Sequence, residues 1–290
     1  MIKKAIILCG GTGTRMYPIT KSINKQLLPL LDKPMFFYPL SILMLCGIKN
    51  FLFIINKGQK KNFTKIIGPT KDLGINIQYK EQLKPNGLPE AFSLGKKFIA
   101  NDPIIMTLGD NFFYGSMISP LLKKSFNMNE GANIYLYPSK NTSSYGVVEL
   151  NKNGTIKKII EKPVFTKSNL VITGLYAFDS NVVNYIKNLK PSLRNELEIV
   201  DLINIYKRKK KLNLIKLGRG TAWMDVGSYE DLYSASSFIK NIEDRQNYKI
   251  GCLEEISFNN KWITKKNILN RIKFNKNSNY SKYLETLIIQ

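Results

Sequence analysis

The 290-residue sequence contains no histidine and only three cysteines. Without imidazole, the commonest general base and nitrogen metal ligand, chemistry must rely on carboxylates, lysine and arginine. Cys9, Cys46 and Cys252 lie in apolar contexts without metal-ligand spacing, which predicts reduced, buried thiols in a cytoplasmic protein. No apolar run is long enough to span a membrane or to resemble a signal peptide, so we expect no membrane association.

Acidic side chains are also scarce, and the formal net charge is +23. Such a charge is ordinarily typical of binding to nucleic acid or to an anionic surface. Here lysine is frequent throughout, so the charge is spread along the chain. The one dense run, residues 207–211, falls at the expected end of a helix, where cations complement the helix dipole. Because no basic stripe with interleaved aromatics occurs, we expect no nucleic-acid partner.

A glycine-rich stretch follows the first apolar run directly, as Leu8-Cys9-Gly10-Gly11-Thr12-Gly13-Thr14-Arg15. Glycines let backbone N–H groups approach phosphate oxygens, and a guanidinium adds bidentate positive charge. The spacing matches neither a P-loop nor a dinucleotide-binding turn. The stretch predicts a phosphate-binding loop after a strand, and a glycine turn without a ligand stays the alternative on these residues alone.

The first half of the chain alternates short apolar strands with helices. Strands are expected over residues 2–8, 51–55, 75–79 and 104–108, and helices over 35–46, 59–67 and 89–99. This order predicts an α/β fold with a Rossmann-like doubly wound sheet, whose ligands gather beyond the carboxyl ends of the strands. A strand-rich region follows, over 132–137, 145–150, 155–161 and 171–178, and helices are expected over 228–239 and near the C-terminus.

Two aspartates stand where a ligand would be expected. Asp110 follows the strand over 104–108, and Asp225 lies in Trp223-Met224-Asp225-Val226-Gly227. Asp110 can be a turn-capping residue, and Asp225 can cap the helix expected from Ser228. Alternatively, both can bind Mg²⁺, which takes one or two carboxylates together with substrate phosphates. The residues alone leave both interpretations open.

The order of short motifs along the chain is more specific than any one of them. In sequence they read GGTGTR, KQLLP, DKPM, GLPEAF, LGDN, YGVVE, EKP, TGLY, ELEIVD and GRGTAWMDVG. The series resembles the glucose-1-phosphate thymidylyltransferase family of sugar nucleotidyltransferases over roughly residues 3–290. The resemblance implies a mixed nucleotidyltransferase sheet with a strand-rich sugar-binding lobe. It also implies transfer of dTMP from dTTP to glucose 1-phosphate, which gives dTDP-glucose for dTDP-rhamnose or related deoxysugars.

The same resemblance implies Mg²⁺ as cofactor, a homotetramer, and two parts of the chain. Residues 1–240 would form the nucleotidyltransferase core, nucleotide-binding in its first half and sugar-binding in its second. Residues 241–290 would form a C-terminal helical appendage for regulation and oligomerisation. A related enzyme that uses UTP or another sugar 1-phosphate, and a non-catalytic sugar-nucleotide sensor, remain the alternative functions.

Roles follow for the residues that match the motifs. The catalytic set is Arg15, Lys25, Asp110, Lys162, Arg194 and Asp225, with the two aspartates as magnesium ligands. The nucleotide-binding set is Leu8, Gly10, Gly11, Gly13, Thr14, Gln26, Gln82 and Gly87. The sugar-binding set is Tyr145, Gly146, Glu161 and Ile172. The incoming sugar phosphate is already ionised near neutral pH, since its second pKa is about 6, so the reaction needs no general base.

A second, regulatory pocket for a nucleotide sugar is the part where the chain departs from the family. Its expected residues are Tyr114, Gly115, Arg219, Glu255 and Ile256. Ser119 and Pro120 stand where the family commonly has His-Glu, and Asn259 stands at a common arginine position. Because a lost cation weakens the hold on an anionic diphosphate, we expect weak feedback inhibition by dTDP-rhamnose.

Overall fold

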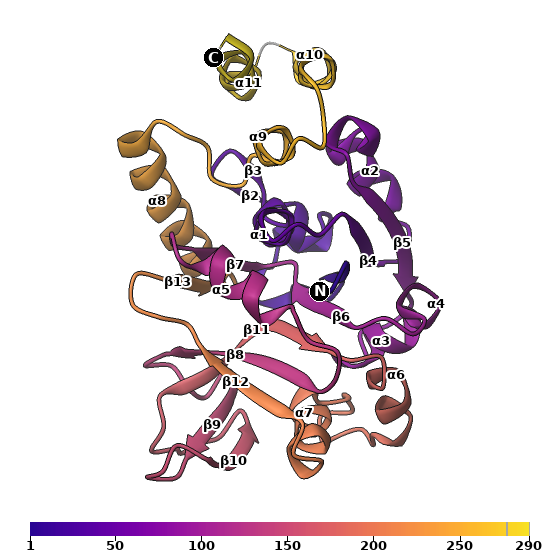
Figure 1. Cartoon of the computed structure of the whole chain (residues 1–290), viewed down its shortest axis with the longest axis vertical. Helices are drawn as coiled ribbons and strands as arrows, with labels where there is room; N and C mark the ends of the chain where they lie inside the picture. Colours follow the sequence, from indigo (N-terminus) through magenta and orange to yellow (C-terminus); the bar gives the residue numbers. More distant parts are fainter. Residues whose placement is uncertain (277, 290) are drawn as a thin grey trace.

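The computed structural model describes residues 1–276 and 278–289. Its centre is a nine-stranded mixed sheet with the order β10-β9-β11-β6-β1-β4-β5, to which β8 adds beside β11 and β12 beside β8 (Figure 1). The strands are β1 (Lys4–Cys9), β4 (Asn50–Asn56), β5 (Asn76–Gln82), β6 (Ile104–Leu108), β8 (Ala132–Pro138), β9 (Gly146–Leu150), β10 (Ile156–Glu161), β11 (Leu170–Phe178) and β12 (Leu212–Lys216).

Helices cover both faces of this sheet, as the alternating pattern predicts. Successive side chains of a strand point to opposite faces, so Ile7 packs into one core and Ile6 into the other. The first core includes α1 (Phe37–Leu45), α2 (Lys60–Ile67) and α5 (Ile118–Ser125). The second includes α3 (Glu90–Leu94), α4 (Lys96–Ile99), α6 (Val182–Tyr185) and α7 (Ile199–Arg208). The doubly wound α/β fold is therefore confirmed.

The strand-rich second half extends the same sheet instead of forming a sheet of its own. β11 pairs antiparallel with β6 of the parallel half and also with β8 and β9. The expected helix over 89–99 is divided at Gly95, where a Cβ would lie 2.9 Å from Ile6 Cδ1 and 3.2 Å from Leu52 Cδ2. The close approach to the sheet explains why glycine stands there.

Two short antiparallel ladders lie outside the main sheet. β2 (Pro29–Leu30) pairs with β3 (Lys33–Pro34), and β7 (Asn111–Tyr114) pairs with β13 (Ala222–Asp225). In the second ladder Asp225 lies opposite Asn111, the neighbour of Asp110. Helix α8 (Tyr229–Gln246) begins with a capping box formed by Ser228 and Asp231. The capping interpretation of Asp225 is therefore wrong.

The C-terminal helices pack on the first half of the chain through a buried polar cluster around Arg271. They are α9 (Leu253–Asn259), α10 (Lys265–Phe274) and α11 (Asn279–Ile289), and α8 before them continues across the expected boundary at residue 240. Arg271 Nε donates to Glu254 Oε1 over 2.7 Å, and Arg271 Nη1 donates over 2.6 Å to the carbonyl of Ile67 at the end of α2. Tyr280 of α11 donates to the other oxygen of Glu254. One polar cluster thus joins α2, α9, α10 and α11.

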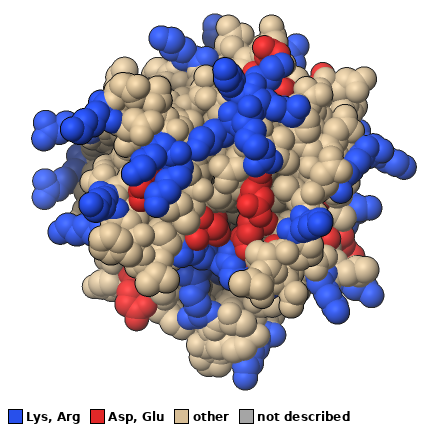
Figure 2. Space-filling model, turned by 90° about the horizontal axis from the view of Figure 1, so that it is seen from below, with Lys and Arg blue, Asp and Glu red and all other residues tan. Residues whose placement is uncertain are grey.

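The surface and the thiols agree with the sequence pattern. Figure 2 shows lysine and arginine scattered over one face, with acidic side chains among them near its centre. All three cysteines are buried and free. Among the described residues, no helix combines the length and the apolar character that crossing a membrane requires.

Candidate active site

A cavity of about 340 Å³ opens where the carboxyl ends of β1, β5 and β6 face the second half of the chain. A smaller cavity adjoins it and shares Gly10, Gly11, Arg15, Gln26 and Asp110 with it. The larger one is lined by fifteen predicted residues: Leu8, Gly10, Gly11, Arg15, Gln26, Gln82, Gly87, Asp110, Tyr145, Gly146, Glu161, Lys162, Ile172, Arg194 and Asp225. The smaller one adds Gly13, Thr14 and Lys25. The fold thus brings the three predicted sets together, while their individual roles stay predictions.

The glycine loop needs its glycines for two different reasons. Gly11 has φ +114° and Gly13 has φ +62°, values that side chains rarely adopt. At Gly10 the reason is space, because a Cβ there would lie 1.9 Å from Gln82 Nε2. Asn24 holds the end of β1 by donating from Nδ2 to the carbonyl of Cys9 over 2.9 Å. The loop is therefore shaped by its neighbours before any phosphate binds.

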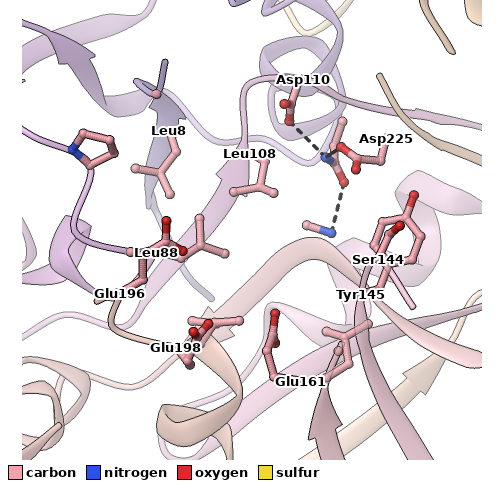
Figure 3. A pocket seen from close by; sticks show the side chains of 18 of the residues that line it. Leu8, Leu88, Leu108, Asp110, Ser144, Tyr145, Glu161, Glu196, Glu198 and Asp225 are labelled. Carbon is pink, nitrogen blue, oxygen red and sulfur yellow. Dashed lines mark hydrogen bonds between the residues drawn. The ribbon is translucent and has the colours of Figure 1, made fainter. Parts of the chain in front are cut away.

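Asp110 and Asp225 lie close together on one side of the cavity, linked by the side chain of Asn111 (Figure 3). Asn111 Nδ2 donates to Asp110 Oδ1 over 3.2 Å and to Asp225 Oδ1 over 3.3 Å. Asn111 Oδ1 accepts from Trp223 Nε1 over 2.7 Å and from the N–H of Gly174 over 3.0 Å. Because both partners of Oδ1 can only donate, the amide orientation is set and both N–H groups face the carboxylates.

The two carboxylates repel one another in a buried setting. Burial first, and then the charge of Asp110, raise the pKa of Asp225 to about 7, and Lys25 and Arg15 oppose that shift. Lys25 is only 8% exposed, and its Nζ lies 2.7 Å from Asp110 Oδ2. Paired carboxylates of this kind suit a hard divalent cation. No group of three or more His, Cys, Asp or Glu side chains suited to a metal occurs in residues 1–276 and 278–289, so further ligands would come from substrate and water.

The opposite side of the cavity holds acidic residues paired with an arginine. Figure 3 shows Glu161 and Glu198 there, across the cavity from Asp110. Arg194 donates to both oxygens of Glu198, over 3.1 Å from Nε and 2.6 Å from Nη2, and Nη2 lies 3.4 Å from Glu161 Oε1. Glu161 Oε2 is buried without a hydrogen-bond partner among the described residues. Such an acceptor is available to a sugar hydroxyl.

Burial, followed by the charge of Glu198, raises the pKa of Glu161, whereas Lys162 and Arg194 lower it.

Apolar and aromatic groups shape the rest of this side of the cavity. The rings of Tyr145 and Trp223 meet edge to face at 5.2 Å between centroids. At Gly146 a Cβ would lie 2.9 Å from Val200 Cγ2. The backbone of β9 therefore packs tightly beneath the cavity at Gly146.

The predicted regulatory residues lie outside both cavities, around the ladder of β7 and β13 and on α9. Tyr114 Oη lies 2.6 Å from Tyr248 Oη, and at Gly115 a Cβ would lie 2.6 Å from the carbonyl oxygen of Gly220, next to Arg219. Glu255 accepts from Tyr283 over 2.8 Å. Ile256 is buried in the first core.

Sequence reasoning missed three residues that organise the site, namely Asn56, Asn111 and Glu198. Asn111 and Glu198 lie within the motifs LGDN and ELEIVD, but neither was assigned a role, and Asn56 lies in none of the motifs. The available signal was position, because Asn56 ends an apolar strand and Asn111 follows Asp110 at the end of another. Polar side chains at such ends gather around the ligand in an α/β sheet.

The sheet, the glycine loop and the paired carboxylates together define a nucleotidyltransferase, and residues 4–242 match the family described as nucleotidyl transferase. The chain is 44% identical over 285 residues to a glucose-1-phosphate thymidylyltransferase of Neisseria meningitidis, which covers 98% of this chain and 99% of that protein. It is 40% identical over 285 residues to the Mycobacterium tuberculosis enzyme of the same name, again with 98% and 99% covered. This chain belongs to the glucose-1-phosphate thymidylyltransferase family.

Solved structures agree on the fold. A crystal structure assigned to a glucose-1-phosphate thymidylyltransferase from Bacillus anthracis, in complex with sucrose, has a TM-score of 0.75 at 36% identity and covers 81% of this chain and 94% of that one. A UDP-glucose pyrophosphorylase in complex with UDP-glucose has a TM-score of 0.72 at 24% identity, over 83% of this chain and 100% of that one. The second likeness concerns the fold alone.

Proposed function

We propose that this chain transfers dTMP from dTTP to glucose 1-phosphate and releases pyrophosphate. The observation that carries the proposal is one cavity that is lined by the glycine loop and Gln82 and also by Glu161 and Arg194. The paired carboxylates lie on the side of this cavity opposite Glu161 and Glu198 (Figure 3). Full-length similarity to enzymes named for this reaction supports the choice of substrates.

The reaction joins two anions, so the site must first neutralise charge. In this proposal Arg15 and Lys25 bind the triphosphate, and Lys162 and Arg194 bind the sugar phosphate. Lys25 is paired with Asp110 and Arg194 with Glu198 before substrate binds. Substrate phosphates would therefore replace these carboxylates as the partners of Lys25 and Arg194. An oxygen of the sugar phosphate would then attack the α-phosphorus of dTTP, and pyrophosphate would leave.

We further propose Mg²⁺ as the cation that Asp110 and Asp225 hold. When bound, it would stabilise negative charge on the transferring phosphoryl group. Asn111 donates a hydrogen bond to one oxygen of each carboxylate, which fixes how the two side chains face the cavity.

We also propose that the protein is cytoplasmic and forms a homotetramer. Light scattering of the purified protein tests the tetramer.

Pyrophosphate release measured over an array of nucleoside triphosphates and sugar 1-phosphates tests the reaction. We expect the highest kcat/KM for dTTP with glucose 1-phosphate and appreciable activity with UTP, because thymine and uracil share the same imide edge. A higher kcat/KM with another sugar 1-phosphate would replace the proposed acceptor. No pyrophosphate release with any pair would favour a sugar-nucleotide sensor.

For the regulatory pocket we propose weak inhibition by dTDP-rhamnose. Arg219 and Lys249 are the two cations that we consider as replacements for an arginine at position 259. Lys249 already forms ion pairs with Asp32 over 2.6 Å and with Glu243 over 2.8 Å. If a charge-assisted hydrogen bond contributes about 1.5–3 kcal/mol, Asn259→Arg should tighten inhibition roughly tenfold or more.

The inhibition constant for dTDP-rhamnose and the KM for dTTP measure this effect, and only the first should change. Asn260→Arg adds the same charge one residue further on and serves as the matched control, with no expected tightening. Tight non-competitive inhibition of the unmodified protein would contradict the proposal.

A further inference from the structure

Asn56 lies between the glycine loop and Gln82 without lining either active-site cavity. It is the last residue of β4, and the register places it opposite Gln82, the last residue of β5. On its other side β4 pairs with β1, whose last residue, Cys9, precedes the loop. The carboxyl ends of three adjacent parallel strands therefore meet at this asparagine.

The backbone of Gly11 sets the orientation of the Asn56 amide. Asn56 Oδ1 accepts from the N–H of Gly11 over 3.0 Å, and Asn56 Nδ2 donates to the carbonyl of Gly11 over 2.7 Å. A backbone N–H can only donate and a carbonyl can only accept, so the reverse orientation would lose both hydrogen bonds.

Asn56 in turn sets the orientation of the Gln82 amide. Gln82 Nε2 donates to Asn56 Oδ1 over 3.2 Å, and Oδ1 can only accept. Turning the Gln82 amide over would place two acceptors against each other. The amide also has little room, since Gln82 is 8% exposed and lies directly over the Cα of Gly10. With one Nε2–H held by Asn56, Oε1 and the second Nε2–H remain for a ligand in the cavity that Gln82 lines.

For a pyrimidine held in one position in the cavity, only one pattern of donor and acceptor matches this pair of groups. Thymine and uracil present N3–H as a donor beside O4 as an acceptor, which complements an amide oxygen beside an amide N–H. Cytosine presents N3 as an acceptor beside an amino donor, and it would need the opposite amide orientation. The hydrogen bonds of Asn56 oppose that orientation.

We propose that Asn56 is a positioning residue for base selection: itself oriented by the backbone of Gly11, it holds the Gln82 amide in the orientation that accepts thymine or uracil and rejects cytosine. This rests on the proposed function in one respect, the assignment of Gln82 as the base contact. A site whose polar groups are set for one hydrogen-bond pattern discriminates strongly against a ligand that leaves them unpaired.

The test is the ratio of kcat/KM for dTTP to kcat/KM for dCTP, with glucose 1-phosphate saturating. Asn56→Ala frees the Gln82 amide to turn, and we expect the ratio to fall at least about tenfold. Asn56→Asp keeps an acceptor toward Gln82, but it loses the donor to Gly11 and adds a negative charge beside the glycine loop. It should therefore raise the KM for both nucleotides while it keeps the ratio. If Asn56→Ala does not fold, Asn56→Ser decides, because a hydroxyl can donate or accept and sets no orientation.

Gln82→Ala and the double variant separate positioning from structure. Gln82→Ala should lower the ratio as much as Asn56→Ala does, and adding Asn56→Ala to it should change the ratio no further. Asn76→Ala, at the other end of β5, is the matched control and should leave the ratio unchanged.

Two results would overturn the inference, and they differ. If Asn56→Ala lowers kcat/KM equally for dTTP and dCTP while Gln82→Ala changes the ratio, Asn56 stabilises the glycine loop but does not orient Gln82. If Gln82→Ala leaves the ratio unchanged, Gln82 does not contact the base, and that part of the proposed function fails as well.

Discussion

Asp110→Asn is expected to lower turnover at least about a hundredfold while the fold stays intact. The substitution keeps the shape of the side chain and can keep the hydrogen bond from Asn111. It removes one of the two negative charges that we propose to hold Mg²⁺ against the transferring phosphoryl group. Pyrophosphate release at an ordinary magnesium concentration measures the effect, and the thermal unfolding midpoint shows whether the fold is kept.

Asp102→Asn is the matched control for this substitution. Asp102 pairs with Lys4 at the surface over 2.7 Å and lies outside both cavities, so its turnover should stay near that of the unmodified protein. Near-normal turnover of Asp110→Asn would contradict the assignment of Asp110 to the reaction. A shared loss in both variants would point to a general effect of charge instead.

Arg271→Leu is expected to lower the free energy of unfolding by about 3–5 kcal/mol. Arg271 and Glu254 are 1% and 0% exposed, so removal of the guanidinium leaves the Glu254 carboxylate buried without its cation. Among the described residues, the side-chain donors that remain to this carboxylate are the hydroxyl of Tyr280 and, at 3.9 Å, the thiol of Cys252. The carbonyl of Ile67 loses a donor at the same time. Urea unfolding measures the loss, provided that the unfolding curve has a single transition.

The double variant Arg271→Leu with Glu254→Leu distinguishes a buried charge from lost packing. Replacing both partners removes the unpaired charge, so much of the lost stability should return. Arg208→Leu, at an exposed position at the end of α7, should have little effect. A loss below about 1 kcal/mol for Arg271→Leu would show that the carboxylate finds another partner.

Local sequence determined those parts of the site that depend on neighbouring residues. The positive φ angles at Gly11 and Gly13 need glycine wherever the loop lies, and the apolar run before them predicts a buried strand. Asp110 directly follows such a strand, so its place at a carboxyl end could be read from the chain. The lack of histidine likewise leaves carboxylates, lysine and arginine as the side chains that can carry the chemistry.

Only the tertiary structure decided which distant residues meet. The ladder of β7 and β13 places Asp225 beside Asp110, although 115 positions separate them in the sequence, and rules out the capping role that the local sequence allowed. Strand register places Asn56 between Gly11 and Gln82, and helix packing buries Arg271 against Glu254. The local pattern of apolar and polar residues specifies that a strand or helix forms and which face is buried. Which elements become neighbours, and in what register, depends on the packing of the whole chain, and that packing also sets the orientation of the amides.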